Sequence, residues 1–255
     1  MTLELVTIPC LETNYAFLLH DAASGQTAVV DVPDSASVLA VLGDKGWRLT
    51  DILITHHHGD HIGGVEALRA ATGARVAGAA ADTHRLPPLD LALTDGMTLT
   101  LGADTVQVID VPGHTVGHIA FHLPESGLAL TGDSLMAGGC GRLFEGTPAQ
   151  MWSSLGKLAA LPPDTLICSG HEYTVANLAF AATLDPGNAA LQARIGRVER
   201  ARSDSRPTVP SRLTDEMATN PFLRADTPAL RAAVQMPDAA AAEVFAEIRA
   251  RKDRF

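Results

Sequence analysis

The stretch Thr55-His56-His57-His58-Gly59-Asp60-His61 carries four histidines and one aspartate within seven consecutive residues. The short apolar run Ile52-Leu53-Ile54 precedes it and Gly63-Gly64 follows it, which predicts a loop between a strand and a helix. Imidazole and carboxylate are ligands that zinc, ferrous iron and manganese bind well. The alternatives are a solvated polar loop or a histidine tag, but a tag lies at a terminus and this cluster is internal. The stretch therefore predicts a metal site.

The composition is that of a globular protein with a sizeable core, because 46% of the 255 residues are hydrophobic and 19% are charged. A formal net charge of −10 argues against nucleic-acid binding and against a surface for anionic membranes. No apolar run approaches the roughly 18–20 residues that cross a bilayer. The first residues lack the basic segment of a signal peptide. We therefore expect a cytoplasmic protein, and a monomer, with no nucleic-acid or membrane partner.

The cysteines Cys10, Cys140 and Cys168 are odd in number, lie far apart and form no Cys-x-x-Cys pair. This pattern fits reduced thiols in a cytoplasm better than a disulfide framework. A reactive thiol is the alternative, but we expect buried and inert ones.

Strand-like and helical runs alternate up to about residue 170. Mixed hairpins and crossovers favour sheets flanked by helices over a purely parallel sheet. Beyond residue 172 the strand pattern almost disappears, so we place a domain boundary there. The expected strands are 3–9, 15–19, 27–31, 52–54, 74–78, 97–101, 105–111, 118–123, 128–131 and 165–168, and the expected helices are 35–45, 62–72, 148–161, 174–184, 188–203 and 238–251.

Four of the expected strands end in loops that combine glycine with a histidine or an aspartate, which suggests that these strand ends meet at one edge. The candidate metal ligands in these loops are His56, His58, Asp60, His61, His114, Asp133 and His171. Seven ligands are too many for one first-row metal ion, so we expect two divalent ions that share Asp133. His57 is expected to point away, and His118 to be a buried or supporting group. Such a site suits hydrolysis, since metals lower the pKa of water and polarise a carbonyl.

The segments Thr55 to His61, Gly113-His114-Thr115, Gly132-Asp133-Ser134 and Gly170-His171-Glu172 together resemble the metallo-β-lactamase superfamily. This resemblance covers roughly residues 1–172 and implies an α/β (α+β) fold. It implies an αββα metallo-β-lactamase-type sandwich that carries the metals (1–172), followed by a smaller all-helical C-terminal domain that contributes to substrate binding (173–255).

Within that superfamily the chain resembles the glyoxalase II family of hydroxyacylglutathione hydrolases. The matching segments are Gly139 to Gly146, Gly170 to Thr174, Thr219 to Arg224 and the tail Arg249 to Phe255. The resemblance implies a glutathione site formed by Arg142, Phe144, Tyr173, Arg249 and Lys252.

The chain departs from the family pattern at three positions, two of them in this site and one near the N-terminus. Many members have Lys where this chain has Arg142, Tyr where it has Phe144, and Asp where it has Thr13. Arg142 keeps the positive charge and Phe144 loses a hydroxyl donor, so the departures concern affinity more than reaction type. The tail Arg249 to Phe255 has four basic groups and one acidic group, which suits a ligand with two carboxylates. Its alternative interpretation is a solvated helix end.

The resemblance implies hydrolysis of S-D-lactoylglutathione and related 2-hydroxyacyl glutathiones to D-lactate and glutathione, the thioesterase step of methylglyoxal detoxification. A metal-bridging hydroxide is the expected nucleophile, and Asp60 and Asp133 are the expected catalytic carboxylates. We expect His56, His58 and His114 on one metal ion and Asp60, His61 and His171 on the other. Zinc is the expected metal; iron and manganese are alternatives.

Two other functions stay open at this point. A persulfide dioxygenase shares the sandwich and a glutathione-linked substrate, but by resemblance it uses one iron and lacks the long helical C-terminal domain. A non-catalytic metal-binding module would require lost ligands, and all seven candidates are present. A β-lactamase is disfavoured because we see no signal peptide.

Overall fold

The computed structural model describes residues 3–255. The chain forms two compact units, of which the first comprises Met1–Asp110 and Gly117–Gly132, and the second comprises Val111–Val116 and Asp133–Phe255. Each unit is described by itself. The boundary that the sequence places near residue 172 stays a prediction.

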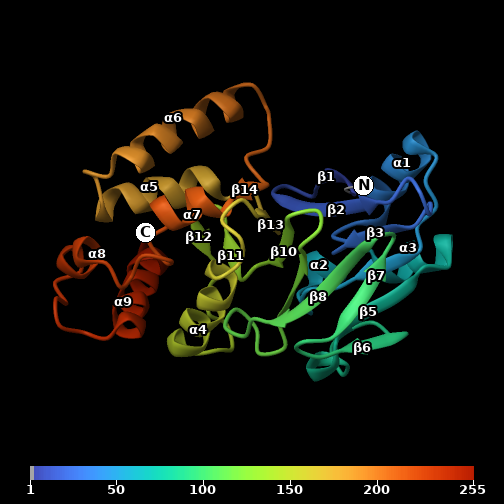
Figure 1. Cartoon of the computed structure of the whole chain (residues 1–255), viewed down its shortest axis with the longest axis horizontal. Coiled ribbons are helices and arrows are strands. Elements are labelled where there is room, and N and C mark those ends of the chain that lie inside the picture. Colours follow the sequence, from blue (N-terminus) through green and yellow to red (C-terminus); the bar gives the residue numbers. More distant parts are fainter. Residues whose placement is uncertain (1–2) are drawn as a thin grey trace. The chain divides into compact units, whose positions relative to one another are not determined.

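The first unit contains a sheet whose strands follow the chain order, from β1 (Glu4–Cys10) and β2 (Asn14–His20) through β3 (Thr27–Val30), β4 (Asp51–Leu53) and β5 (Arg75–Ala79) to β6 (Leu91–Leu93) (Figure 1). The strands β1, β2 and β3 pair antiparallel, with Cys10 opposite Asn14 at the hairpin end. The strands β3 to β6 pair parallel. Parallel neighbours end at the same edge of a sheet, so β3, β4 and β5 deliver the residues that follow them to one place.

Helices connect the parallel strands. The helix α1 (Ser35–Lys45) begins as the sequence predicts, because Asp34 Oδ1 accepts a hydrogen bond from the Ser37 amide and caps it. The predicted helix 62–72 is wrong in one respect: it is two helices, α2 (Gly59–Ile62) and α3 (Val65–Thr72). A Cβ on Gly64 would lie 2.5 Å from the Ser35 nitrogen. The chain therefore passes against the start of α1 at Gly64, which separates the two helices.

One apolar core lies between this sheet and its helices. It is built from alternate residues of the strands, such as Ala16 and Leu18, and from the inward faces of α1 and α3, such as Leu42 and Leu68. These alternate positions confirm the two-residue and helical periodicities on which the strand and helix predictions depend.

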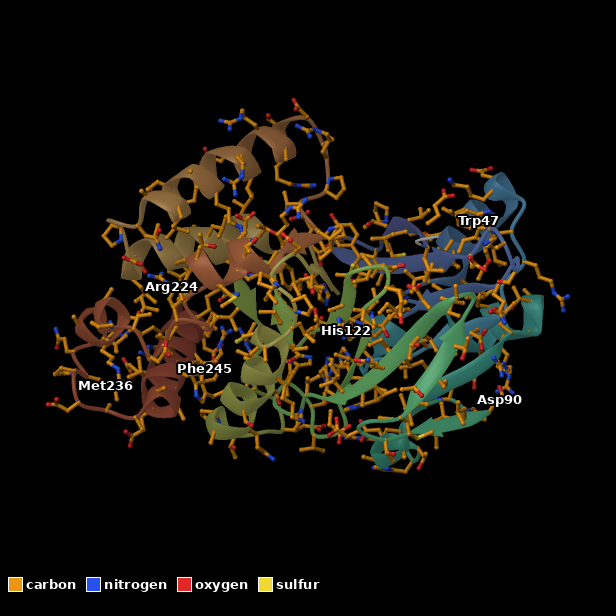
Figure 2. The ribbon with its side chains drawn as sticks, in the orientation of Figure 1. Trp47, Asp90, His122, Arg224, Met236 and Phe245 are labelled. Carbon is orange, nitrogen blue, oxygen red and sulfur yellow. The ribbon has the colours of Figure 1, made fainter. Side chains whose placement is uncertain are left out.

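The first unit also contains β7 (Thr98–Leu101), β8 (Asp104–Asp110), β9 (Ile119–Leu123) and β10 (Leu128–Gly132), which pair antiparallel in that order (Figure 1). All four were expected from the sequence. On β9, His122 is buried and its Nδ1 lies 3.1 Å from Gln107 Oε1 (labelled in Figure 2). The short helix η1 (Ala80–Asp82) follows β5.

The second unit is mostly helical. It contains the short hairpin β11 (Leu135–Met136) and β12 (Gly139–Cys140), and the strand pair β13 (Leu166–Ser169) and β14 (Ser211–Arg212). Its helices are α4 (Pro148–Ala159), α5 (Thr174–Leu184), α6 (Ala189–Ser203), α7 (Leu213–Thr219), α8 (Pro228–Ala233) and α9 (Ala241–Arg254). A capping box of Thr147 and Gln150 begins α4.

An aromatic cluster joins helices of the second unit. On α9, Phe245 is fully buried (labelled in Figure 2), and its ring lies 6.2 Å from Trp152 of α4 and 5.7 Å from Phe222. Edge and tilted contacts of this kind stabilise a core beyond the area that they bury. No helix within residues 3–255 is both long and apolar enough to span a bilayer.

Candidate metal centre and substrate pocket

Three parallel strands of the first unit end at the edge that carries the histidine-rich loop. Asp31 follows β3, Thr55 to His58 follow β4, and Asp82 lies just after β5. Asp31 has a φ angle of 57°, a left-handed conformation that aspartate tolerates better than most residues. Asp31 is also the residue whose side chain orients the histidines of the loop, as its hydrogen bonds show.

Asp31 is a buried hydrogen-bond hub. Its Oδ1 accepts from the Thr55 amide at 2.9 Å, and its Oδ2 accepts from Thr55 Oγ1 at 2.8 Å and pairs with His61 Nδ1 at 2.8 Å. Because the Thr55 hydroxyl proton points to Asp31, Thr55 Oγ1 accepts from His56 Nδ1, which lies 3.0 Å away. One carboxylate thus fixes the orientation of two imidazoles.

These contacts assign the histidine tautomers and test whether the loop suits a metal ion. His56 and His61 both donate through Nδ1, so in their neutral forms both keep a lone pair on Nε2. His56 Nε2 lies 3.2 Å from His58 Nδ1, and His61 Nε2 lies 3.8 Å from Asp60 Oδ2. Lone pairs that converge in this way fit a divalent cation.

The four predicted ligands of this loop therefore come together in the first unit. Asp60 lies in α2, and Asn14 Nδ2 donates to its carboxylate oxygen Oδ2 at 3.0 Å and to its main-chain oxygen at 3.1 Å. His57 points elsewhere, because its Nδ1 lies 3.0 Å from Asp82 Oδ2. His118 is buried and stacks on His56 with ring centroids 4.7 Å apart, so it supports a ligand.

The other three predicted ligands come together in the second unit. Asp133 Oδ2 lies 3.5 Å from His114 Nε2 and 3.3 Å from His171 Nε2, and all three residues are buried. His114 Nδ1 donates to the Arg142 carbonyl at 2.7 Å, so neutral His114 presents a lone pair to the carboxylate. Two acceptors that face each other at this distance suit a shared cation. These residues, too, fit a metal ion.

Two aromatic side chains flank this histidine pair. Tyr173 stacks on His171 with ring centroids 4.7 Å apart and an angle of 3°, and Phe144 makes an edge contact with His114 at 5.3 Å. Tyr173 and Phe144 are 41% and 61% exposed, so each leaves a face open to a ligand. The Phe144 amide donates to the His114 carbonyl at 3.2 Å, which ties the Arg142 to Phe144 loop to the histidine.

A close approach of backbones holds the same loop. A Cβ on Gly141 would lie 2.0 Å from the Asp133 carbonyl oxygen and 2.9 Å from His114 Nδ1. The Gly141 amide donates to the Ser134 carbonyl at 3.1 Å. A side chain at position 141 would therefore displace the segment that carries Arg142 from the histidine it supports.

The three candidate cations for glutathione differ in how they are engaged. Arg249 is 7% exposed, and its guanidinium donates to the Cys140 carbonyl at 3.0 Å. It also donates to Asp253 Oδ1 through Nε at 3.1 Å and through Nη2 at 2.9 Å. Lys252 donates to the Ala176 carbonyl at 3.1 Å. The Arg142 side chain is 59% exposed and its Nε lies 3.4 Å from the same Asp253 oxygen.

The thiols of the chain are buried, as expected from the sequence. Burial raises the pKa of Cys140 to about 11, although the neighbouring Arg249 acts in the opposite direction. Burial also raises the pKa of Cys168, and raises that of Cys10 to about 12 with a further contribution from Asp34. A nucleophilic cysteine requires a thiolate, which these surroundings disfavour.

Comparison with known proteins defines the family. The model of the metallo-beta-lactamase superfamily matches residues 13–171, and the model of the hydroxyacylglutathione hydrolase C-terminus matches residues 172–255. A hydroxyacylglutathione hydrolase of Cereibacter sphaeroides is 69% identical over the full length of both chains. The chain belongs to the hydroxyacylglutathione hydrolase family. The resemblance stated from the sequence motifs is therefore confirmed.

Solved structures place the family in a wider fold. The BLEG-1 B3 metallo-beta-lactamase is similar with a TM-score of 0.67 at 23% identity, over 86% of this chain and 99% of that one. A second structure, TTHA1623 in a di-iron-bound form, has a TM-score of 0.55 at 32% identity over 66% of this chain and 91% of that one. The mixed α/β metallo-β-lactamase fold with a C-terminal helical region is thus confirmed.

Sequence reasoning missed three residues that contact the candidate site residues of this hydroxyacylglutathione hydrolase family member. Asp31 closes an apolar strand in the same way as the recognised ligands, so the strand-end rule would have found it. Asn14 begins β2 directly after a hairpin turn, and no pattern in the sequence links it to Asp60. Asp253 was counted as part of a basic tail, although it pairs with both Arg249 and Arg142.

Proposed function

We propose that the chain hydrolyses S-D-lactoylglutathione and related 2-hydroxyacyl glutathiones to D-lactate and glutathione, as a step in methylglyoxal detoxification. The observation that carries this proposal is the full-length match to relatives that bear the name hydroxyacylglutathione hydrolase, at 69% and 66% identity. The two ligand groups support it, because every candidate ligand of the sequence lies in a group that suits a cation.

We propose two metal ions, held by seven side chains. His56, His58 and His114 would hold one ion, Asp60, His61 and His171 the other, and Asp133 both. When bound, the ions would lower the pKa of water and polarise the thioester carbonyl. Zinc is the metal that we propose, since imidazole and carboxylate are its usual ligands; iron is the alternative, and the di-iron form of a relative supports it.

The side chains of the protein would do the rest of the work. Asp60 would orient the attacking water and accept its proton. Phe144 and Tyr173 would flank the reacting thioester, because each contacts a histidine and leaves an exposed face. The leaving group is a thiolate, which is stable without protonation, so the site needs no dedicated general acid. The buried cysteines would take no part.

The glutathione carboxylates would be bound by Arg142 and Lys252, with Arg249 behind them. Arginine suits a carboxylate because its planar fork donates two hydrogen bonds.

We also propose the division into a metal-bearing part (1–172) and a helical, glutathione-binding part (173–255). We further propose a monomer in the cytoplasm, to be tested by sedimentation and by cell fractionation. The three free cysteines support a reducing compartment.

The decisive experiment is a comparison of substrates on one metal-replete preparation. We expect release of glutathione from S-D-lactoylglutathione, no oxygen consumption with glutathione persulfide, and no cleavage of a β-lactam. Metal content is measured on the same sample. Turnover of the persulfide without turnover of the thioester would replace this proposal with the dioxygenase.

A further inference from the structure

Asn14 is a buried amide placed against Asp60, a half-exposed residue of the histidine-rich loop. It is 5% exposed and begins β2 at the end of a hairpin in which seven residues of β1 pair with seven of β2. Its Nδ2 has two N–H bonds and two acceptors, the main-chain oxygen of Asp60 at 3.1 Å and the carboxylate oxygen Oδ2 at 3.0 Å. One amide therefore fixes both the backbone and the side chain of Asp60.

Asp60 needs such support more than its neighbours do. The side chain of Asp60 is 43% exposed, whereas that of His61 is fully buried. Its helix α2 has four residues, and the N-cap residue His58 makes no side-chain capping bond. A half-exposed carboxylate on a short helix would otherwise sample several rotamers, and ordering it on metal binding would cost conformational entropy.

We infer that Asn14 is a positioning residue that holds the Asp60 carboxylate ready for the second metal ion. This inference rests on the proposed two-metal site, in which Asp60 and His61 belong to the same ion. The geometry supports it, because the Oδ2 atom that accepts from Asn14 is also the atom 3.8 Å from His61 Nε2. A rigid hairpin is a suitable base for such a residue, since sites on regular elements are more precise than those on loops.

A purely structural role makes a different prediction. A buried polar group that lacks a hydrogen bond is destabilising, so in a purely structural role Asn14 only satisfies its own amide donors. In that case its loss would lower the stability of the metal-free protein and leave the two metal affinities in their original ratio. A positioning role changes that ratio, because the first ion does not use Asp60.

The test compares two variants with a matched control. Asn14→Leu keeps the shape of the side chain and removes both donors, and Asn14→Ala removes the side chain. Asn177→Ala is the control, since Asn177 is also buried (7% exposed) and donates to a main-chain oxygen, that of Ala137 at 3.1 Å. Each full-length protein is titrated with zinc against a competing chelator, and the melting temperature of the metal-free form is recorded.

We expect the second zinc equivalent to bind about 10–100-fold more weakly in both Asn14 variants, the range usual for a lost supporting contact, while the first is unchanged. Asn177→Ala should keep both affinities. Equal weakening of both equivalents, or no weakening, overturns the role of Asn14. A wild-type protein that binds a single equivalent overturns the two-metal proposal itself, and the inference with it.

Discussion

The loop after β4 and the last turns of α9 both carry polar groups assigned to the site, but their partners differ. In the loop, Asp31 accepts a hydrogen bond from His61 Nδ1 and Thr55 accepts one from His56 Nδ1. Each ring therefore turns its Nε2 atom toward another candidate ligand, as His56 Nε2 does toward His58 Nδ1. In α9, the Arg249 guanidinium is already engaged by Asp253 and the Cys140 carbonyl. Buried polar groups thus indicate a ligand site where acceptor atoms face one another. They indicate a structural role where each donor already has an acceptor.

The largest effect should come from removing the hub of the loop. Asp31→Asn keeps the shape and tolerates the left-handed backbone, but its amide nitrogen would face a donor at His61 or Thr55. We expect metal content after dialysis to fall and kcat/KM to drop by about 100-fold or more, because two ligands lose their orientation together.

Asp34→Asn is the control for this variant. Asp34 caps α1 and is close to Asp31 in sequence, but its carboxylate accepts from the amide and the hydroxyl of Ser37. Its loss should cost about 1 kcal/mol or less of stability and leave metal content intact. Full metal content in Asp31→Asn would show that the loop does not depend on this hub.

A smaller effect is expected at Arg249, and it should be of a different kind. Arg249→Ala removes two of the donors to Asp253 and the donor to the Cys140 carbonyl. We therefore expect a lower melting temperature together with a loss in kcat/KM of about 10–100-fold, mostly through KM. Arg142→Ala, at an exposed position, should raise KM without changing the melting temperature. A small thioester without glutathione carboxylates should be hydrolysed equally by all three proteins.

The outcome bears directly on the comparison between the two regions. If Arg249→Ala lowers kcat on both substrates alike with KM and stability unchanged, Arg249 acts in the chemistry and the contrast with the loop disappears. If the two arginine variants behave identically, the burial of Arg249 has no functional meaning.

The two regions also differ in how far the sequence predicts them. The candidate ligands of the loop follow from residue type, from the glycines beside them and from the convergence of parallel strands, all of which are local or nearly local properties. The start of α1 at Ser35 follows from its Asp34 cap in the same way. The contacts of Arg249 depend on which distant chain segment packs against α9, since Cys140 is 109 residues away. No periodicity encodes that choice.

Other misses have the same physical origin. The break between α2 and α3 depends on a close approach of Gly64 to the start of α1, which helical periodicity cannot reveal. The link from Asn14 to Asp60 spans 46 residues. The strand β6 and the helices α7 and α8 are short, and their patterns are too brief to stand out from a loop.

A third prediction uses the titration of Lys252 and has a moderate expected effect. Burial lowers the pKa of Lys252, and the neighbouring Arg249 cation lowers it further. The ammonium is charged below its pKa, so binding of a glutathione carboxylate should weaken as the pH rises through that lowered value. We expect KM to rise several-fold in the alkaline range, below the roughly 10–100-fold that one hydrogen bond to a charged group supplies.

Lys252→Arg separates this effect from the titration of glutathione itself. Arginine stays charged over the whole pH range. The KM of the Lys252→Arg variant should therefore follow the titration of the substrate amine alone. KM profiles of the two proteins are measured under identical conditions. Parallel profiles would mean that Lys252 does not contact a carboxylate.

The smallest effect is expected at the thiols, which lie near the second region but should be inert. Burial keeps Cys140 and Cys168 protonated near neutral pH, with the pKa of Cys140 raised to about 11. Cys140→Ala and Cys168→Ala should therefore retain turnover within about an order of magnitude of the wild type, whereas a catalytic nucleophile would cost several orders. Single-turnover reactions quenched in acid and read by mass spectrometry check the same point. A covalent acyl group on Cys140 would make the region around Arg249 part of the chemistry, and the division between a reacting loop and a supporting helix would then be wrong.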